Sequence, residues 1–204
     1  MQIVEILFMG ILLGWGAAIP IGPINLEMIR RNLNFGTRFS LLFGFGACSA
    51  DVLYLVLLSY GVLSLLTYPL VLKIIGILGA FVLIYFAYGA LTAKPSQALE
   101  ASIPKGTLLS HYLSGLLLTL SNPITILFWA SISSQVVTLT VSHPNALIYA
   151  GIGVLMGTVS WVVALNLFLH FTKHKISNAA INMLNKIGGL LLLGFAIFSI
   201  YYAI

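Results

Sequence analysis

Acidic side chains are scarce in this chain, and one of them lies deep in an apolar segment. The 204 residues include only four acids, which are Glu5, Glu27, Asp51 and Glu100. Asp51 is near the middle of the apolar stretch 39–66. A charge at such a place costs about 2.5–3.5 kcal/mol on membrane-insertion scales, and ionisable residues there usually handle ions or protons. Because burial disfavours the charged form of a carboxyl, we expect Asp51 to bind and release a proton. The alternative is a neutral, structural Asp that links two helices.

Two proline motifs interrupt apolar segments at corresponding places in the two halves of the chain. Residues 20–25 read PIGPIN, and residues 121–125 read SNPIT. A break in a membrane helix frees backbone N–H and C=O groups, which protein or a water-filled cavity must receive. Paired breaks are typical of the binding site of a transporter. The substrate-binding residues predicted at the breaks are Pro20, Gly22, Pro23, Asn25, Asn122, Pro123 and Thr125.

The groups at the breaks suit a ligand that carries both charges. The N-termini of half-helices present N–H groups, which favour a carboxylate. Unwound carbonyls and amide side chains favour an ammonium group. An α-amino acid has both, so the pattern is compatible with an amino acid without identifying it.

Glu27 has two possible roles. If residues 24–33 form a short helix, Glu27 lies near its positive N-terminal end and could face a cavity and bind a cationic ligand. Alternatively, Glu27 pairs with Arg31 four residues later on the same helix face. Arg30 is also within reach of Glu27. The sequence leaves both roles open.

Two tryptophans lie inside apolar segments, away from the interfacial depth where Trp is common in membrane proteins. Trp129 and Trp161 are therefore candidate substrate-binding residues that could wall a cavity. The favoured alternative is that they simply pack between helices, as such residues do more often.

Composition places the whole chain in a lipid bilayer. Hydrophobic residues make up 60% and charged residues 6%, and the mean hydropathy is +1.11. The prediction is an all-α integral membrane protein without a soluble catalytic domain, and hence not an enzyme. The single cysteine, Cys48, excludes an internal disulfide and a CxxC redox pair. No histidine or acidic cluster indicates a metal centre, and no cofactor is expected.

Six apolar segments predict six transmembrane helices in one membrane domain, 1–204. They cover residues 3–24, 39–66, 70–92, 111–137, 146–171 and 187–204, and the first and fourth are broken at the proline motifs. The halves 1–92 and 111–204 are joined by a polar connection, 93–110. Because three spans is an odd number, a duplicated unit must insert upside down, so we predict two inverted three-helix repeats. Traces of duplication support this: residues 44–46 and 50–51 match residues 151–153 and 157–158. Chance similarity of apolar segments is the alternative.

Basic residues indicate the orientation. With both termini outside, eight Lys and Arg fall in the cytoplasmic loops and only Lys73 falls on the other side. This distribution predicts that both termini face the periplasm or exterior. The net charge of +5 is then a topology signal and not a sign of nucleic-acid binding.

The motifs resemble those of one known family of exporters. Residues 22–25 (GPIN) and 30–36 (RRNLNFG) look like the first-helix signature of the lysine exporter (LysE/RhtB) family. The second, third and fifth helices of that family are similar to residues 44–51 (GFGACSAD), 79–91 and 153–161. The Asn-Pro motif of its fourth helix is similar to residues 121–129 (SNPITILFW).

The resemblance implies an exporter of amino acids or related small amine metabolites in the bacterial inner membrane, driven by proton motive force. It also implies the inverted three-plus-three fold. The expected partners are an amino acid, protons and the lipid bilayer, with a homo-oligomer possible. The alternatives are a divalent metal-cation exporter of the same superfamily and a non-transporting membrane scaffold.

Overall fold

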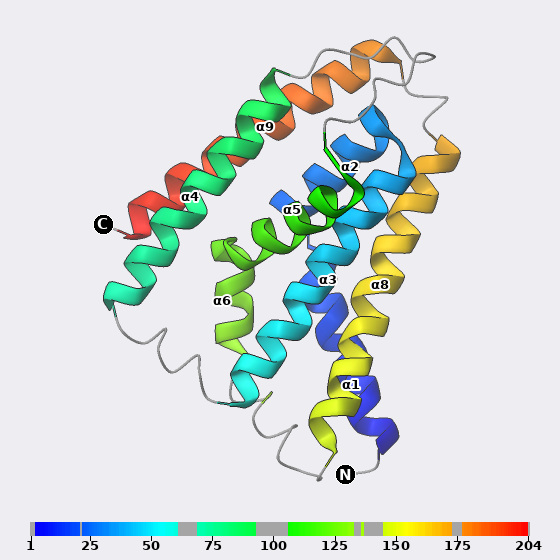
Figure 1. Cartoon of the computed structure of the whole chain (residues 1–204), viewed down its shortest axis with the longest axis vertical. Coiled ribbons are helices and arrows are strands. Elements are labelled where there is room, and N and C mark those ends of the chain that lie inside the picture. The colour runs from blue at the N-terminus through cyan, green and yellow to red at the C-terminus, as the bar shows by residue number, and fades with distance from the viewer. Residues whose placement is uncertain are drawn as a thin grey trace.

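All regular structure in the described part of the chain is helical. The computed structural model describes residues 3–20, 22–60, 69–92, 106–132, 136, 145–172 and 177–203. These residues contain eight helices (Figure 1): α1 (Ile3–Ala18), α2 (Pro23–Phe35), α3 (Thr37–Ser59), α4 (Pro69–Leu91), α5 (Leu108–Leu120), α6 (Pro123–Ser131), α8 (Ala146–Thr172) and α9 (Asn178–Ala203). The prediction of an all-α protein is confirmed.

Three helices, α3, α8 and α9, are long and apolar enough to cross a membrane by themselves. Two bent pairs qualify when each pair is taken as one span: α1 with α2, bent by 74°, and α5 with α6, bent by 58°. In α4, the segment Ile77–Leu91 counts as a shorter apolar helix. The described residues thus hold three to five candidate spans, and six spans in two inverted repeats stay a prediction.

The helix breaks occur where the proline motifs predict them. Pro23 and Pro123 are the first residues of α2 and α6. Proline suits this position because its fixed φ is helical and its missing N–H would have no partner in the helix. The predicted half-helix 24–33 corresponds to α2.

Several helix ends differ from the sequence prediction because polar residues cap them. Thr107 accepts a hydrogen bond from the Ser110 N–H at 3.3 Å, so α5 begins at Leu108 and not at residue 111. Ser177 accepts one from the Ala180 N–H at 3.2 Å, and α9 begins at Asn178 instead of residue 187. The predicted ends at 66 and 137, and residues 93–105 of the polar connection, lie outside the described residues.

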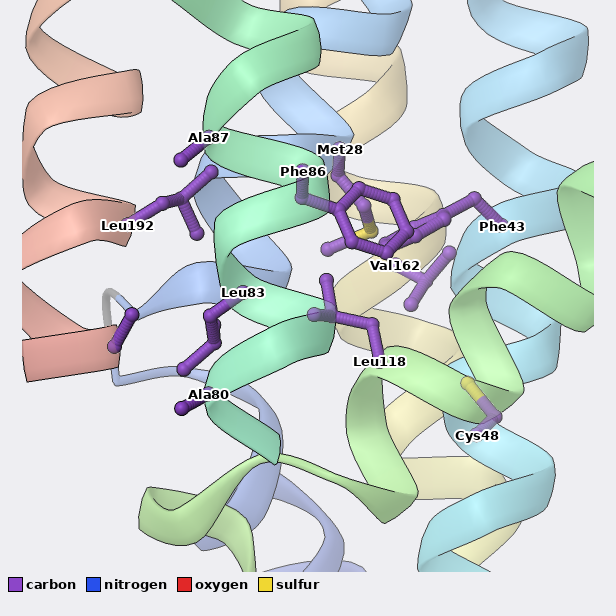
Figure 2. Packing of buried hydrophobic residues seen from close by; sticks show 11 residues of the cluster. Met28, Phe43, Cys48, Ala80, Leu83, Phe86, Ala87, Leu118, Val162 and Leu192 are labelled. Atoms are coloured by element: carbon purple, nitrogen blue, oxygen red, sulfur yellow. The ribbon is translucent and has the colours of Figure 1, made fainter. Parts of the chain in front are cut away.

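The helices pack in an order that does not follow the chain. α1 packs against α8, α3 packs against both α5 and α8, and α4 packs against α9 (Figure 1). The crossing pair α4–α9 joins the other helices mainly through α2. Of two buried clusters, one surrounds Trp129 and the other surrounds Phe43 and Phe86 (Figure 2).

Glycine allows two of these helix pairs to pack backbone against backbone. A Cβ on Gly10 of α1 would lie only 2.6 Å from the carbonyl oxygen of Ala150 in α8. A Cβ on Gly115 of α5 would overlap the carbonyl oxygen of Phe43 in α3. Small residues at such contacts are the usual means by which membrane helices approach closely.

Gly115→Ala should destabilise the fold, because the new methyl group forces α5 away from α3. Overpacking of this kind costs about 1–3 kcal/mol. Thermal unfolding of the protein in detergent should show a lower midpoint. The matched control is Gly194→Ala in α9, where a Cβ meets no described atom within 4 Å. That variant should unfold at the wild-type temperature or slightly above it, since alanine favours helix. Equal midpoints for the two variants would contradict a tight α3–α5 contact.

Candidate functional site

The backbone groups freed at the first break are received by Asn25. Its side-chain Nδ2 donates to the carbonyl oxygens of Ala18 at 2.9 Å and Pro20 at 2.8 Å. Its Oδ1 accepts a hydrogen bond from Nε1 of Trp161 at 3.1 Å. Asn25 is 3% exposed. This amide therefore closes the C-terminal end of α1 and ties the break to α8.

The second break is satisfied by its own polar residues and by α3. Asn122 accepts a hydrogen bond from the Ile124 N–H at 3.2 Å, which caps α6, and its Nδ2 donates to Oγ1 of Thr125 at 2.9 Å. The hydroxyl of Tyr54 in α3 donates to the carbonyl oxygen of Leu120 at 2.7 Å. Both breaks thus have protein partners for groups that lipid cannot satisfy.

A cavity of about 120 Å³ lies between the two breaks, and we call it the Asp51 cavity. It brings together most of the site residues that the sequence predicts. Those that line it are Pro20, Gly22, Asn25, Asp51, Asn122, Thr125 and Trp161. Pro23, Glu27 and Trp129 are not among its lining residues, and the side chain of Pro123 lies outside the described part.

Asp51 is held in place by a tryptophan behind the cavity wall. Nε1 of Trp129 donates to Oδ1 of Asp51 at 3.0 Å. Trp129 is fully buried, and its ring packs against Tyr54 and Phe128. Trp129 thus packs between helices, the favoured of its two expected roles, and its N–H orients the carboxyl that does line the cavity. Trp161 does line it.

Glu27 takes the second of its two possible roles. Its Oε1 lies 2.7 Å from Nη2 of Arg30 and 2.8 Å from Nε of Arg31, and the side chain is fully buried. Residues three and four apart share one face of a helix. On α2 that face differs from the one that carries Asn25 and Met28 into the Asp51 cavity. In this structure Glu27 therefore contacts two arginines and does not face the cavity.

Three further polar residues that the sequence reasoning missed line the same cavity: Cys48, Thr119 and Thr158. Cys48 is one helical turn before Asp51, so the two share a face of α3. Thr158 occupies in the second half the position that Asp51 has in the matched segment of the first half. The spacing of Cys48 from Asp51 and the alignment of Thr158 with Asp51 were both present in the sequence.

The family model of the LysE type translocator matches residues 16–203. The chain belongs to the LysE type translocator family. The translocator is 28% identical over 197 residues to the putative amino acid efflux protein YcgF of Bacillus subtilis (strain 168). The match covers 95% of this chain and 94% of that protein.

Its resemblance extends to proteins named for a particular amino acid. The translocator is 30% identical over 188 residues to the leucine efflux protein of Salmonella choleraesuis (strain SC-B67), a match that covers 86% of this chain and 85% of the relative. The leucine efflux protein of Salmonella typhimurium (strain LT2) matches equally well. No solved structure matches the chain. Family membership and the apolar helices make the translocator a multi-pass membrane protein.

Proposed function

We propose that this translocator exports an amino acid, or a similar small amine metabolite, across the bacterial inner membrane, driven by the proton motive force. The observation that carries the proposal is the cavity between two broken helices with Asp51 in its wall. The similarity to amino acid efflux proteins supports the class of substrate.

Asp51 is the group that would couple the substrate to protons. It is the only acid among the described residues that line the Asp51 cavity. A carboxyl there can hold a proton or the ammonium group of a substrate, and exchange of the two would link export to proton entry. The Trp129 N–H fixes one carboxyl oxygen, so the position of the charge is set before the substrate binds.

One acid in the cavity favours a neutral amino acid over a dibasic one. A zwitterion presents one ammonium group, which a single carboxylate balances, and the one acid of α2, Glu27, is already paired with arginines. Exchange of one inward proton for one neutral amino acid also moves a net charge, which is worth about 2.3 kcal/mol per 100 mV. Exchange for a cationic amino acid would be electroneutral and use only the pH gradient.

The helix contacts support an inverted repeat. Exchange of the two halves maps α1 onto α5, α3 onto α8 and α4 onto α9. The α1–α8 contact then becomes the α5–α3 contact, while the α3–α8 and α4–α9 contacts map onto themselves. These four contacts are the principal ones of the fold. Tyr54 and Trp161, at matching positions after Asp51 and Thr158, each donate to a helix break. Such a repeat around one midplane site is how many transporters alternate access.

The proposal can be tested by efflux from cells preloaded with labelled amino acids. Cells that produce the protein should release a neutral amino acid such as leucine faster than cells that lack it, and lysine should be released at the background rate. Collapse of the membrane potential should slow the release of leucine.

If neither amino acid leaves faster than from cells without the protein, the proposal fails and a non-transporting scaffold becomes the better interpretation. Faster release of a divalent metal cation would instead support the metal exporter. Among the described residues, no group of three or more His, Cys, Asp or Glu could hold such an ion.

A further inference from the structure

A second cavity, which we call the Arg31 cavity, lies between α2, α4 and the start of α5. Its volume is about 620 Å³, and its lining includes Arg30, Arg31, Gly89 and His111. No described residue lines both this cavity and the Asp51 cavity. No sequence motif indicates this cavity, because its wall is assembled from three separate helices.

Among the described residues, the wall of the Arg31 cavity carries an unbalanced positive charge. Two guanidinium groups, those of Arg30 and Arg31, share the single carboxylate of Glu27. Arg31 is 6% exposed, and its guanidinium carbon lies 4.5 Å from the ring centroid of Phe43. A buried charge is costly unless it is paired. With one carboxylate for two cations, the wall can accept one further negative charge.

His111 lines the same wall and contacts Arg31. Its Nδ1 lies 2.6 Å from Nη1 of Arg31. A guanidinium can only donate, so Nδ1 is the acceptor and the ring proton is on Nε2. His111 is 4% exposed, and its Nε2 has no hydrogen-bond partner among the described residues. The cavity therefore combines two guanidinium groups, which match an oxyanion, with a histidine that holds Arg31 in place, while Nε2 of that histidine is itself buried.

The two cavities lie along the same two helices. α5 runs from His111 at the Arg31 cavity to Thr119 at the Asp51 cavity, a rise of about 12 Å. On α2, Met28 lines the Asp51 cavity and Arg31, less than one turn later, lines the other. The apolar side chains of Met28, Phe43 and Phe86 pack together in one cluster (Figure 2). Met28 lines the Asp51 cavity, and Phe86 lines the Arg31 cavity. They form an apolar layer between the cavities.

We propose that the Arg31 cavity is a loading site that binds the carboxylate of the amino acid before the substrate crosses this apolar layer to Asp51. A carboxylate supplies the one negative charge that the wall lacks, and the cavity is several times larger than the Asp51 cavity. The proposal rests on the proposed function. The other source of an oxyanion is the phosphate of a lipid headgroup, because Tyr85 and Tyr88 beside the cavity are exposed on the outer surface.

Thiol labelling inside the cavity tests the proposal directly. Gly89→Cys places a thiol in the wall, where a Cβ has only Nη2 of Arg30 nearby, at 4.0 Å. The background carries Cys48→Ala, which removes the single native cysteine. The purified protein in detergent is alkylated by a maleimide in the presence of leucine, 4-methylpentanoate or 3-methylbutylamine. These probes carry both charged groups, the carboxylate alone and the amine alone.

Leucine and 4-methylpentanoate should slow the labelling severalfold, and 3-methylbutylamine should not. Arg31→Gln should abolish the protection, while Arg38→Gln, which removes an exposed arginine of α3, should keep it. If Arg31→Gln does not fold, His111→Phe, which changes no formal charge, should weaken the protection. Asp51→Asn should leave it intact, which separates this site from the Asp51 cavity.

Three results would overturn the proposal. Labelling that neither carboxylate slows would show that the cavity does not bind this group. Protection by phosphatidylglycerol alone would assign it to a lipid headgroup. Protection that Asp51→Asn removes would mean that only one site exists. If carboxylates protect the thiol but cells show no efflux, the carboxylate site stands and the proposed function fails. If cells export leucine but carboxylates do not protect the thiol, the proposed function stands and the loading site fails.

Discussion

Asp51→Asn should reduce efflux to the rate of cells that lack the protein, while the variant still folds. Asparagine keeps the oxygen that accepts the Trp129 N–H bond, so the packing around residue 51 is preserved. It cannot gain or lose a proton, and it cannot balance an ammonium group. Since no other acid lines the Asp51 cavity among the described residues, no neighbour can take over this role. The measurement is the initial rate of release of labelled leucine from preloaded cells.

The control for this prediction removes an acid elsewhere in the membrane domain. Glu5→Gln changes an exposed residue in the first turn of α1 and should export at the wild-type rate. The thermal unfolding midpoint in detergent reports whether the variant keeps its fold. An unchanged midpoint with lost efflux is the expected result for Asp51→Asn. Wild-type efflux by this variant would refute a coupling role for Asp51.

Glu27→Gln should cause the largest loss of stability among single charge substitutions. The carboxylate of Glu27 bonds to both Arg30 and Arg31, and all three side chains are largely buried. Removal of one partner leaves a buried charge without compensation, which costs about 3–5 kcal/mol. Here two guanidinium groups lose their partner at once. The thermal unfolding midpoint in detergent, and the yield of folded protein, should both fall well below those of Glu5→Gln.

The same variant separates the two roles that the sequence left open for Glu27. If its unfolding midpoint matches that of the wild type while efflux of leucine is lost, then Glu27 contacts the ligand and the pairing with arginine is secondary. If Glu27→Gln is unstable and Glu5→Gln is not, the pairing is the main role. Arg38→Gln provides the corresponding control for loss of an exposed charge at the same end of the bundle.

Local features of the fold could be predicted from the sequence because their causes are local. Proline cannot continue a helix and suits the first position of the next one, so the breaks at Pro23 and Pro123 were predictable. Asp51 stands out because its apolar neighbours make a charge costly. The early start of α9 was missed because residues 178–186 look polar, although Ser177 caps a helix there.

The parts of the site that could not be predicted depend on contacts between distant segments. Nothing near Trp129 in the chain shows that its N–H reaches Asp51, which is 78 residues away. The two roles of Glu27 differ only in which face of α2 turns toward the cavity, and the helices packed around α2 decide that. His111 is the first residue of the predicted segment 111–137, yet it contacts Arg31 across the α2–α5 interface.

The glycine contacts determine which parts of the molecule can move. α1 and α8, and likewise α3 and α5, touch through backbone atoms at these glycines, so each pair resists sliding there. The interface between α3 and α8 is different, because a Cβ on Gly44 would meet the side chain of Val162 and not the α8 backbone. We therefore expect two rigid bodies that shear past each other along α3 and α8. The Asp51 cavity lies on that shear plane, where a small sliding motion would change its shape most.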